Sequence, residues 1–341
     1  METVMPWELR EIGPEWDAHW DALAGQTPES GFMQASAWAA FKRAEGYQTP
    51  RWGLFEAGEL RGGACMLSYP ARGNEGFLVC PDGPILPWSN TPRAREGLRA
   101  LLAQAEAWAA RHGGLGLRIE PRLPPPCPSL LRNATRAPVD LNPIHSLILD
   151  LTLSDAELRA QMHPKGRYNL GLAERHGVQV TRSTRMQDLP VFYALFRETS
   201  ERRSFFAEPY GFFLNLGAAL FPCRMAELFL ASWQGEPLAA LLMVTFGRRA
   251  TYLYGGSSAQ HRNLMPTYAL HWAALQAARE RGCQEYDLYG YDPFGQPDHL
   301  YAGFSRFKRQ FGGVRRDSIG GWDFLFYDRL AETLANRLAH A

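Results

Sequence analysis

Hydrophobic and polar positions follow the same order in two stretches of the chain. From Arg51 the sequence reads RWGLFEAGELRGGACML, which predicts a hairpin that turns at Ala57 and Gly58. The segment FLVCPDGP, a helical run over residues 92–112 and the strand GLGLRIEP follow. This stretch therefore reads β-β-β-α-β.

The second stretch repeats that order. From Glu227 the sequence reads ELFLASWQGEPLAALLMV, a hairpin that turns at Gln234 and Gly235. The segment ATYLYGGSS, a helical run over residues 267–281 and the strand QEYDLYG complete it. An internal repeat of this length predicts two related structural units.

Both long helices have one apolar face and recognisable ends. Thr91 is placed to cap the first helix, and Gly113 and Gly282 are placed to end the two helices. We expect the apolar faces to be mostly core, although a Tyr or His at a helix start is also suited to line a cleft. The faces comprise Leu98, Leu101, Leu102, Ala105 and Trp108 in the first helix and Tyr268, His271, Trp272, Leu275 and Ala278 in the second.

A Pro-rich passage, RLPPPCPSL, separates the repeats, and a predicted strand then opens the second half. Ser154 and Glu157 form a capping-box pattern, and Gly177 is placed as a helix stop. Pro164 breaks this helical region, so we expect a second helix over residues 165–175.

The predicted fold is α/β (α+β), with two tandem acetyltransferase-like lobes built on mixed sheets. We expect the first lobe to span residues 1–147 and the second 148–319, with residues 320–341 packing back on the first. No heptad run predicts a coiled-coil arm.

Composition indicates a folded cytoplasmic protein. Of the 341 residues 46% are hydrophobic, and no run approaches the about 20 apolar residues that span a bilayer. The five cysteines are scattered, so we expect buried thiols rather than disulfides or a metal site.

Net charge of +1 gives no global attraction to nucleic acid, so DNA is not an expected partner and any tRNA contact must be local. The chain has only three lysines among 36 basic residues: Lys42, Lys165 and Lys308. Such a lysine is either chemically required or a chance survivor on the surface.

Coenzyme A is disfavoured. An acetyl-CoA enzyme of this topology needs a glycine-rich loop whose N–H groups cradle the pyrophosphate before the main helix. The corresponding segments here, WSNTPRA and QHRNLMPTYA, are not glycine-rich and place proline near the helix start.

Several motifs in order resemble the FemABX family of aminoacyl transferases. They are SAWAAFK from Ser36, KGRYNLGLAERHGVQV from Lys165, YLYGGSS with NLMPTYALHWAALQAARERG, YDLYG from Tyr286, and GFSRFKRQFGG from Gly303 with IGGWD. Together they cover most of the chain.

The resemblance implies transfer of Gly, Ala or Ser from aminoacyl-tRNA to the diamino-acid side chain of UDP-MurNAc-pentapeptide or lipid II. It implies no metal or organic cofactor. A lipid II acceptor would add a peripheral membrane contact, and the compact form, without the helical arm of larger members, suggests a monomer.

This chemistry requires a cation near the reacting ester, because an oxyanion develops and the leaving ribose oxygen takes up a proton. Lys308, with Phe307, matches the family lysine expected at the reacting centre; the alternative is an edge-strand lysine. Glu120 matches a family acidic residue once considered a base, or else pairs with Arg118 or Arg122.

Other matched positions predict binding roles. Lys42, with Trp38, matches the position that holds the precursor diphosphate, or else is a solvated helix lysine. Lys165 and Arg167, and Arg306 and Arg309 beside the reactive lysine, are candidates for tRNA or phosphate contact. The remaining substrate-binding candidates are Arg203, Glu208, Phe212, Tyr254, Asn263 and Tyr268.

One departure affects precursor recognition: Glu208 replaces a family arginine, and Phe212 stands near a family tyrosine. Arg202 or Arg203 is a candidate substitute. Two alternatives to the tRNA-dependent enzyme remain open from sequence, an acyl-CoA N-acyltransferase of the same fold and a non-catalytic tRNA-binding protein.

Overall fold

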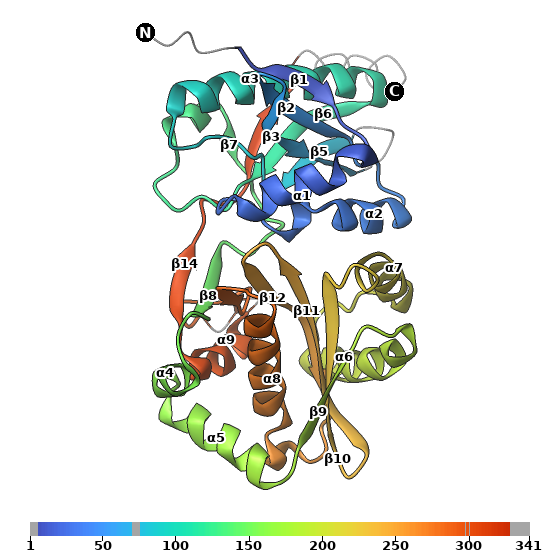
Figure 1. Cartoon of the computed structure of the whole chain (residues 1–341), viewed down its shortest axis with the longest axis vertical. Helices are drawn as coiled ribbons and strands as arrows, with labels where there is room; N and C mark the ends of the chain where they lie inside the picture. Colours follow the sequence, from blue (N-terminus) through green and yellow to red (C-terminus); the bar gives the residue numbers. More distant parts are fainter. Residues whose placement is uncertain (1–5, 70–75, 297, 300, 328–341) are drawn as a thin grey trace. The chain divides into compact units, whose positions relative to one another are not determined.

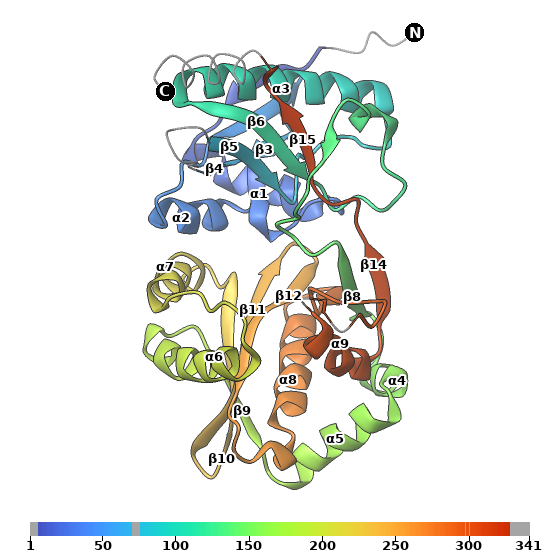
Figure 2. The same cartoon turned by 180° about the vertical axis from the view of Figure 1, so that it is seen from behind.

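The computed structural model describes residues 6–69, 76–296, 298–299 and 301–327. The chain forms two compact units, unit 1 with residues 1–144 and 318–341 and unit 2 with residues 145–317 (Figures 1 and 2). The sequence prediction placed the boundaries after residues 147 and 319. Of the segment 320–341, residues 328–341 lie outside the described part.

Unit 1 consists of two sheets with helices against them. Its elements are β1 (Glu8–Glu11), α1 (Asp17–Gln26), α2 (Ser36–Ala44), β2 (Arg51–Glu56), β3 (Glu59–Cys65), β4 (Leu67–Tyr69), β5 (Gly76–Pro81), α3 (Thr91–His112), β6 (Gly114–Glu120), β7 (Thr135–Arg136) and β15 (Trp322–Leu325), with short 3-10 turns η1 (Pro14–Trp16), η2 (Phe32–Gln34) and η3 (Ser129–Leu131).

Unit 2 is built on one larger sheet. Its elements are β8 (His145–Asp150), α4 (Asp155–Gln161), α5 (Pro164–Arg175), β9 (Gln179–Ser183), α6 (Leu189–Arg203), α7 (Tyr210–Leu220), β10 (Ala226–Trp233), β11 (Glu236–Phe246), β12 (Arg249–Ser257), α8 (Pro266–Glu280), β13 (Glu285–Asp287), α9 (Ala302–Lys308) and β14 (Val314–Asp317), with 3-10 turns η4 (Met186–Asp188), η5 (Arg262–Leu264) and η6 (Arg309–Phe311).

The predicted repeat is confirmed. Unit 1 contains β2, β3, β5, α3 and β6 in the predicted order, and unit 2 contains β10, β11, β12, α8 and β13. Both hairpin turns have positive φ at the two central residues, 53° and 81° at Ala57 and Gly58 and 51° and 84° at Gln234 and Gly235. This is the two-residue turn that matches the twist of paired strands.

The two repeats differ in how their sheets are joined. Unit 2 has seven strands in the order β14-β8-β13-β12-β11-β10-β9, with β12 and β13 parallel. In unit 1 the chain leaves β3 at Met66 and continues as β4, so β1-β2-β3 and β4-β5-β6-β15-β7 form separate sheets. β15 returns to pair with β6 from more than 200 residues further along the chain.

The main helix of each unit buries the predicted apolar face. In α3, Leu98, Leu101 and Ala105 are 3%, 0% and 0% exposed, and in α8, Leu275 and Ala278 are 2% and 0% exposed. Figure 2 shows α8 lying along the strands of the unit 2 sheet. Burial of such a face supplies most of a helix's stability.

Local predictions around Pro164 are confirmed. Ser154 Oγ accepts a 3.3 Å hydrogen bond from Glu157 N–H, and Glu157 Oε2 accepts one of 2.8 Å from Ser154 N–H, which completes the capping box. α4 ends before Pro164, and α5 starts there because a proline at the first helical position loses no helical hydrogen bond.

Two local predictions are wrong. The N-cap of α3 is Asn90, whose Oδ1 accepts from Arg93 N–H, because Thr91 already lies within the helix. Cys127 and Cys223 are exposed, unlike Cys65, Cys80 and Cys283, because Cys127 lies in the irregular segment before η3 and Cys223 in the turn after α7. No helix among the described residues combines the length and the apolar character needed to cross a bilayer.

Candidate active site

Lys308 is the last residue of α9 and is buried, with 6% of the residue exposed. Its Nζ donates hydrogen bonds to the backbone carbonyl oxygens of Gly290 and Tyr289, at 2.6 and 3.2 Å. The edge-strand alternative for Lys308 is therefore wrong, since the residue lies on a helix and its ammonium points into the unit.

The surroundings of Lys308 change its protonation. Burial lowers the pKa of Lys308 to about 7, and the negative charge of Asp287 opposes this shift. Burial, with a smaller effect of the Lys308 charge, lowers the pKa of His271 to about 3, so this imidazole is neutral near pH 7. Near neutral pH Lys308 therefore populates both its protonated and its neutral form.

Aromatic rings surround this lysine. The Tyr252 and Tyr301 rings have their centroids 5.5 and 5.8 Å from Lys308 Nζ. On the same side of α8, the Phe307 ring packs 5.2 Å from Tyr268 and 5.3 Å from His271. Tyr268 is 6% exposed, so core packing describes it, and its hydroxyl donates to Gln310 Oε1 at 2.7 Å.

Three of the predicted phosphate-binding cations have exposed side chains, and two of them flank Lys308 in sequence. Arg306, Arg309 and Lys165 are exposed. α5 packs against η6 at Gly166, where a Cβ would lie 2.3 Å from the Gln310 carbonyl oxygen. The first turn of α5, with Lys165, therefore lies beside the segment that follows Lys308.

Arg167 has a different role from Lys165 in this packing. Its guanidinium donates to the carbonyl oxygens of Ala160, at 3.1 Å, and of Met162. These are carbonyls at the end of α4, so Arg167 satisfies helix-terminal acceptors. Both contacts of Arg167 are thus structural, and they hold the end of α4 against α5.

A second group of predicted residues meets between α6, α7 and β12. The Tyr254 ring packs 5.2 Å from Phe213 and 6.0 Å from Phe212, which is 8% exposed. Burial, followed by the charge of Glu208, raises the pKa of the Tyr254 hydroxyl. Glu208 therefore lies close enough to Tyr254 to influence its ionisation.

Three further polar candidates lie at or near the ends of helices in unit 2. Arg203 is exposed at the end of α6, and Asn263 is exposed in η5 before α8. Arg202 instead donates 2.8 Å to the carbonyl oxygen of Ser257, which ties α6 to β12. Of the two arginines considered as substitutes at Glu208, Arg203 is thus the one whose guanidinium is exposed.

In unit 1, Lys42 is buried in α2, with 8% exposed, and its Nζ lies 4.5 Å from the centroid of the Tyr47 ring. The solvated-lysine alternative is therefore wrong. Trp38, one turn earlier, is 5% exposed, and its ring packs 4.9 Å from Phe32. Trp38 belongs to the core that supports α2.

Glu120 ends β6 and is 3% exposed. Its two carboxylate oxygens each accept a 2.9 Å hydrogen bond, from Leu141 N–H and from Asn142 N–H. Burial raises its pKa, and these two hydrogen bonds partly offset the shift. The contacts favour a structural role, in which Glu120 holds the loop at residues 141–142.

Sequence reasoning missed Asp287, which is 0% exposed and acts electrostatically on Lys308, and His271 as a member of the same buried group. The motif YDLYG did mark the segment, but its pattern predicts a strand and gives no reason to single out the aspartate. His271 was predicted to be either core or cleft-lining, and it is 3% exposed.

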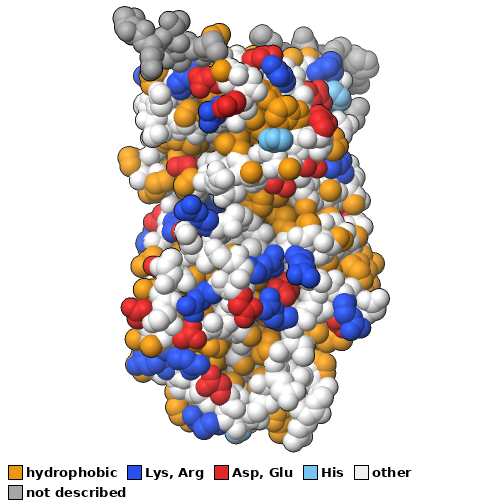
Figure 3. All heavy atoms as spheres, viewed as in Figure 1, with side chains coloured by type: hydrophobic (Ala, Val, Ile, Leu, Met, Phe, Trp, Pro, Cys, Tyr) orange, Lys and Arg blue, Asp and Glu red, His pale blue; other side chains and the backbone are white. Residues whose placement is uncertain are grey.

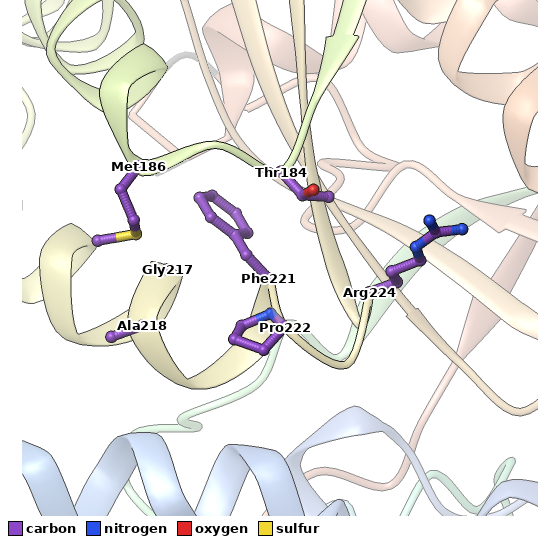
Figure 4. A pocket seen from close by; sticks show the side chains of 7 residues that line it. All are labelled: Thr184, Met186, Gly217, Ala218, Phe221, Pro222 and Arg224. Atoms are coloured by element: carbon purple, nitrogen blue, oxygen red, sulfur yellow. The ribbon is translucent and has the colours of Figure 1, made fainter.

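A separate hollow of about 280 Å³ in unit 2 contains none of the predicted site residues. Figure 4 shows Met186 and Phe221 on its apolar side and Arg224 pointing away from them. Figure 3 shows Lys and Arg side chains interspersed with Asp and Glu on the face in view, in agreement with the net charge of +1.

Two family models match the chain. A FemAB family model matches residues 17–125, within unit 1. A model of an acetyltransferase (GNAT) domain matches residues 165–309, within unit 2, and its last residues include Lys308.

Among curated proteins, the chain is similar to lipid II:glycine glycyltransferase of Staphylococcus epidermidis strain RP62A, at 23% identity over 94% of this chain and 95% of the relative. The enzyme of that name from Staphylococcus aureus strain MRSA252 matches at 23% identity, with the same coverage. That alignment spans 405 positions, more than the 341 residues of this chain, so the relative has residues without a counterpart here.

Among solved structures, a crystal structure of FemX superposes with a TM-score of 0.86 at 21% identity, covering 96% of this chain and 99% of that one. A tandem GNAT protein from the clavulanic acid biosynthesis pathway superposes with a TM-score of 0.54 at 14% identity, over 94% of this chain and 98% of that one. The fold is thus that of a tandem acetyltransferase-like protein. The predicted resemblance to the FemABX family is confirmed, and the described residues include no coiled-coil arm.

Proposed function

We propose that this protein is an aminoacyltransferase that adds glycine, delivered as glycyl-tRNA, to the diamino-acid side chain of a peptidoglycan precursor. The curated relatives named lipid II:glycine glycyltransferase support the transferred residue and the acceptor class. The observation that carries the chemistry is the buried Lys308, whose ammonium is held by two backbone carbonyls.

In this reaction the acceptor amine forms a bond to the ester carbonyl carbon, and the carbonyl oxygen gains negative charge. Collapse breaks the bond to the ribose oxygen, which leaves with the electron pair and takes up a proton. The amine nitrogen loses a proton, so the overall proton count balances. An ammonium with a pKa of about 7 can stabilise the oxyanion and donate that proton.

Contacts at the start of α8 support an acyl donor other than coenzyme A. Pro266 is the first residue of α8 and has no N–H group. The N–H groups of Leu264, Met265 and Tyr268 donate to carbonyl oxygens within the same turn, at 3.0, 3.2 and 3.0 Å. These amides are engaged and are not aimed outward to hold a pyrophosphate.

For the acceptor we propose that Lys42 provides the charge for the precursor diphosphate, and that Glu208, Phe212, Tyr254, Asn263 and Arg203 contribute to precursor recognition. For the RNA we propose Lys165, Arg306 and Arg309, because they are exposed beside the segment that carries Lys308. Arginine and lysine side chains are the usual partners of nucleic-acid phosphates.

A donor comparison tests the proposal. Purified protein is incubated with UDP-MurNAc-pentapeptide or lipid II and with glycyl-, alanyl- or seryl-tRNA, or with acetyl-CoA, and the acceptor is analysed by mass spectrometry. We expect one added glycine with glycyl-tRNA, and no acetylation or thermal stabilisation with acetyl-CoA.

The control variant is Arg61→Ala, since Arg61 is exposed in the β2–β3 hairpin and pairs with Glu59. It should transfer glycine at the wild-type rate, whereas Lys308→Ala should transfer it at least about 100-fold more slowly and still bind tRNA. Acetylation of the acceptor would replace the proposal with an acyl-CoA transferase, and tRNA binding without turnover by wild-type protein would replace it with a binding protein.

A further inference from the structure

Asp287 organises the turn whose carbonyls contact Lys308. It is the last residue of β13 and is 0% exposed. Its Oδ1 accepts a 2.7 Å hydrogen bond from Tyr289 N–H and a further hydrogen bond from the Ser146 hydroxyl on β8. Tyr289 has a φ of 58°, in the left-handed region that residues with a Cβ rarely adopt.

Such a backbone conformation persists only where surrounding contacts fix it. Further along the turn, Tyr291 N–H donates 3.0 Å to the His145 carbonyl oxygen, and Asp292 N–H donates 2.7 Å to Ser305 Oγ on α9. The turn is therefore attached to β8 on one side and to the helix that carries Lys308 on the other.

We propose that Asp287 is a positioning residue for Lys308, an inference that rests on the proposed role of Lys308. The buried carboxylate of Asp287 fixes the turn at residues 289–290, and the two carbonyl oxygens of this turn accept hydrogen bonds from the Lys308 ammonium. Asp287 acts through this turn and through its charge. It does not contact the reacting atoms.

The other titratable groups facing Lys308 do not supply a negative charge near pH 7. His271 on α8 is neutral, since its pKa is about 3. Burial raises the pKa of the Tyr252 hydroxyl on β12 to about 12, and it also raises that of Tyr301 before α9. Asp287 on β13 is the group whose charge favours the protonated lysine.

The test uses lysine labelled with ¹³C at Cε, because the chain has three lysines and each signal is readily assigned by substitution. The ¹³C shift is followed against pH in wild-type protein and in Asp287→Asn, which removes the charge but keeps an oxygen that can accept from Tyr289 N–H. We expect the Lys308 midpoint to fall by about one unit or more in Asp287→Asn, with the Lys165 midpoint unchanged.

Activity provides the second readout. Above pH 7 we expect kcat of Asp287→Asn to fall by about tenfold, with KM changed less than about twofold, because a smaller share of Lys308 is protonated and the ammonium acts in the transition state more than in substrate binding. Asp155→Asn is the matched control, since Asp155 is an exposed carboxylate on α4 that pairs with Arg279. It should leave the Lys308 midpoint and kcat unchanged.

An unchanged Lys308 midpoint in folded Asp287→Asn would overturn the proposal. If that variant does not fold, Asp287→Glu tests the proposal instead, because it keeps the charge but displaces the oxygen that accepts from Tyr289 N–H. We expect a nearly wild-type midpoint and slower transfer, and wild-type kcat would overturn the positioning role. The titration needs no substrate, so a lowered midpoint with no transfer by wild-type protein would count against the proposed function alone.

Discussion

The ammonium of Lys308 donates a 2.6 Å hydrogen bond to the backbone carbonyl oxygen of Gly290. A backbone carbonyl can accept this bond but cannot neutralise the lysine by taking its proton. The contact therefore orients a buried cation whose pKa of about 7 leaves it able to give up its proton during a reaction.

Replacing this lysine should remove catalysis while sparing binding. We expect Lys308→Ala to lower kcat about 100- to 1000-fold, the usual effect of losing one group that stabilises an oxyanion. Lys308→Arg should recover little, because the planar guanidinium does not fit a site built for a compact ammonium. Steady-state kinetics with glycyl-tRNA measures kcat of both variants. A near wild-type kcat for Lys308→Ala would exclude Lys308 from the chemical step.

Transfer should decline as the pH rises through about 7, the pKa of Lys308, because the protonated form donates the proton to the leaving oxygen. The profile of kcat/KM against pH measures this in the free enzyme. The decline should be absent from the residual activity of Lys308→Arg, since a guanidinium stays charged throughout. A decline that persists in this variant must come from another group.

Lys42 should affect the precursor more than the RNA. Lys42→Met keeps much of the apolar stem but removes the charge, so we expect KM for the precursor to rise about tenfold, with kcat nearly unchanged. Kinetics in which the precursor and glycyl-tRNA are varied in turn gives a separate KM for each substrate. An equal effect on KM for glycyl-tRNA would place Lys42 outside precursor recognition.

Glu120 should contribute to stability. Glu120→Gln turns one acceptor into an N–H donor that faces a backbone N–H, so we expect a loss of about 1–3 kcal/mol. Chemical denaturation measures the loss, and kcat of the folded protein should stay within about twofold of wild type. A large fall in kcat without a change in stability would instead support the predicted role as a base.

Glu285 should make unit 2 sensitive to acid. Burial alone would raise its pKa, but hydrogen bonds from Arg316 and the charge of Arg249 outweigh burial and lower the pKa to about 2. This stabilisation is present above the ordinary pKa of a glutamate and is lost as pH falls toward 2. Glu285→Gln should therefore unfold more easily at pH 7 and show a smaller further loss of stability on acidification, as followed by thermal melting.

The sequence predicted features that depend on neighbouring residues better than features that depend on contacts between distant parts of the chain. The hairpin turn at Gln234 and Gly235, the capping box at Ser154 and the break at Pro164 each follow from a few neighbouring residues. The burial of Lys308 cannot be predicted from neighbouring residues, because it requires α9 to pack against a turn about 18 residues earlier in the chain.

The turn itself is equally hidden from sequence reasoning. A tyrosine gives no indication of the positive φ at Tyr289, which glycine or asparagine would have signalled. The separate sheets of unit 1 were not predicted either, since the chain changes sheets at Met66 without a proline or glycine at that residue.

The most direct test of the account is a single-turnover reaction with radiolabelled glycyl-tRNA, enzyme in excess and the precursor as acceptor, followed by tandem mass spectrometry of the product. We predict one glycine on the side-chain amine of the diamino acid, formed by wild-type protein and by Arg61→Ala at the same rate and by Lys308→Ala at least about 100-fold more slowly. Folded wild-type protein that transfers no amino acid from glycyl-, alanyl- or seryl-tRNA to either precursor form would contradict the account.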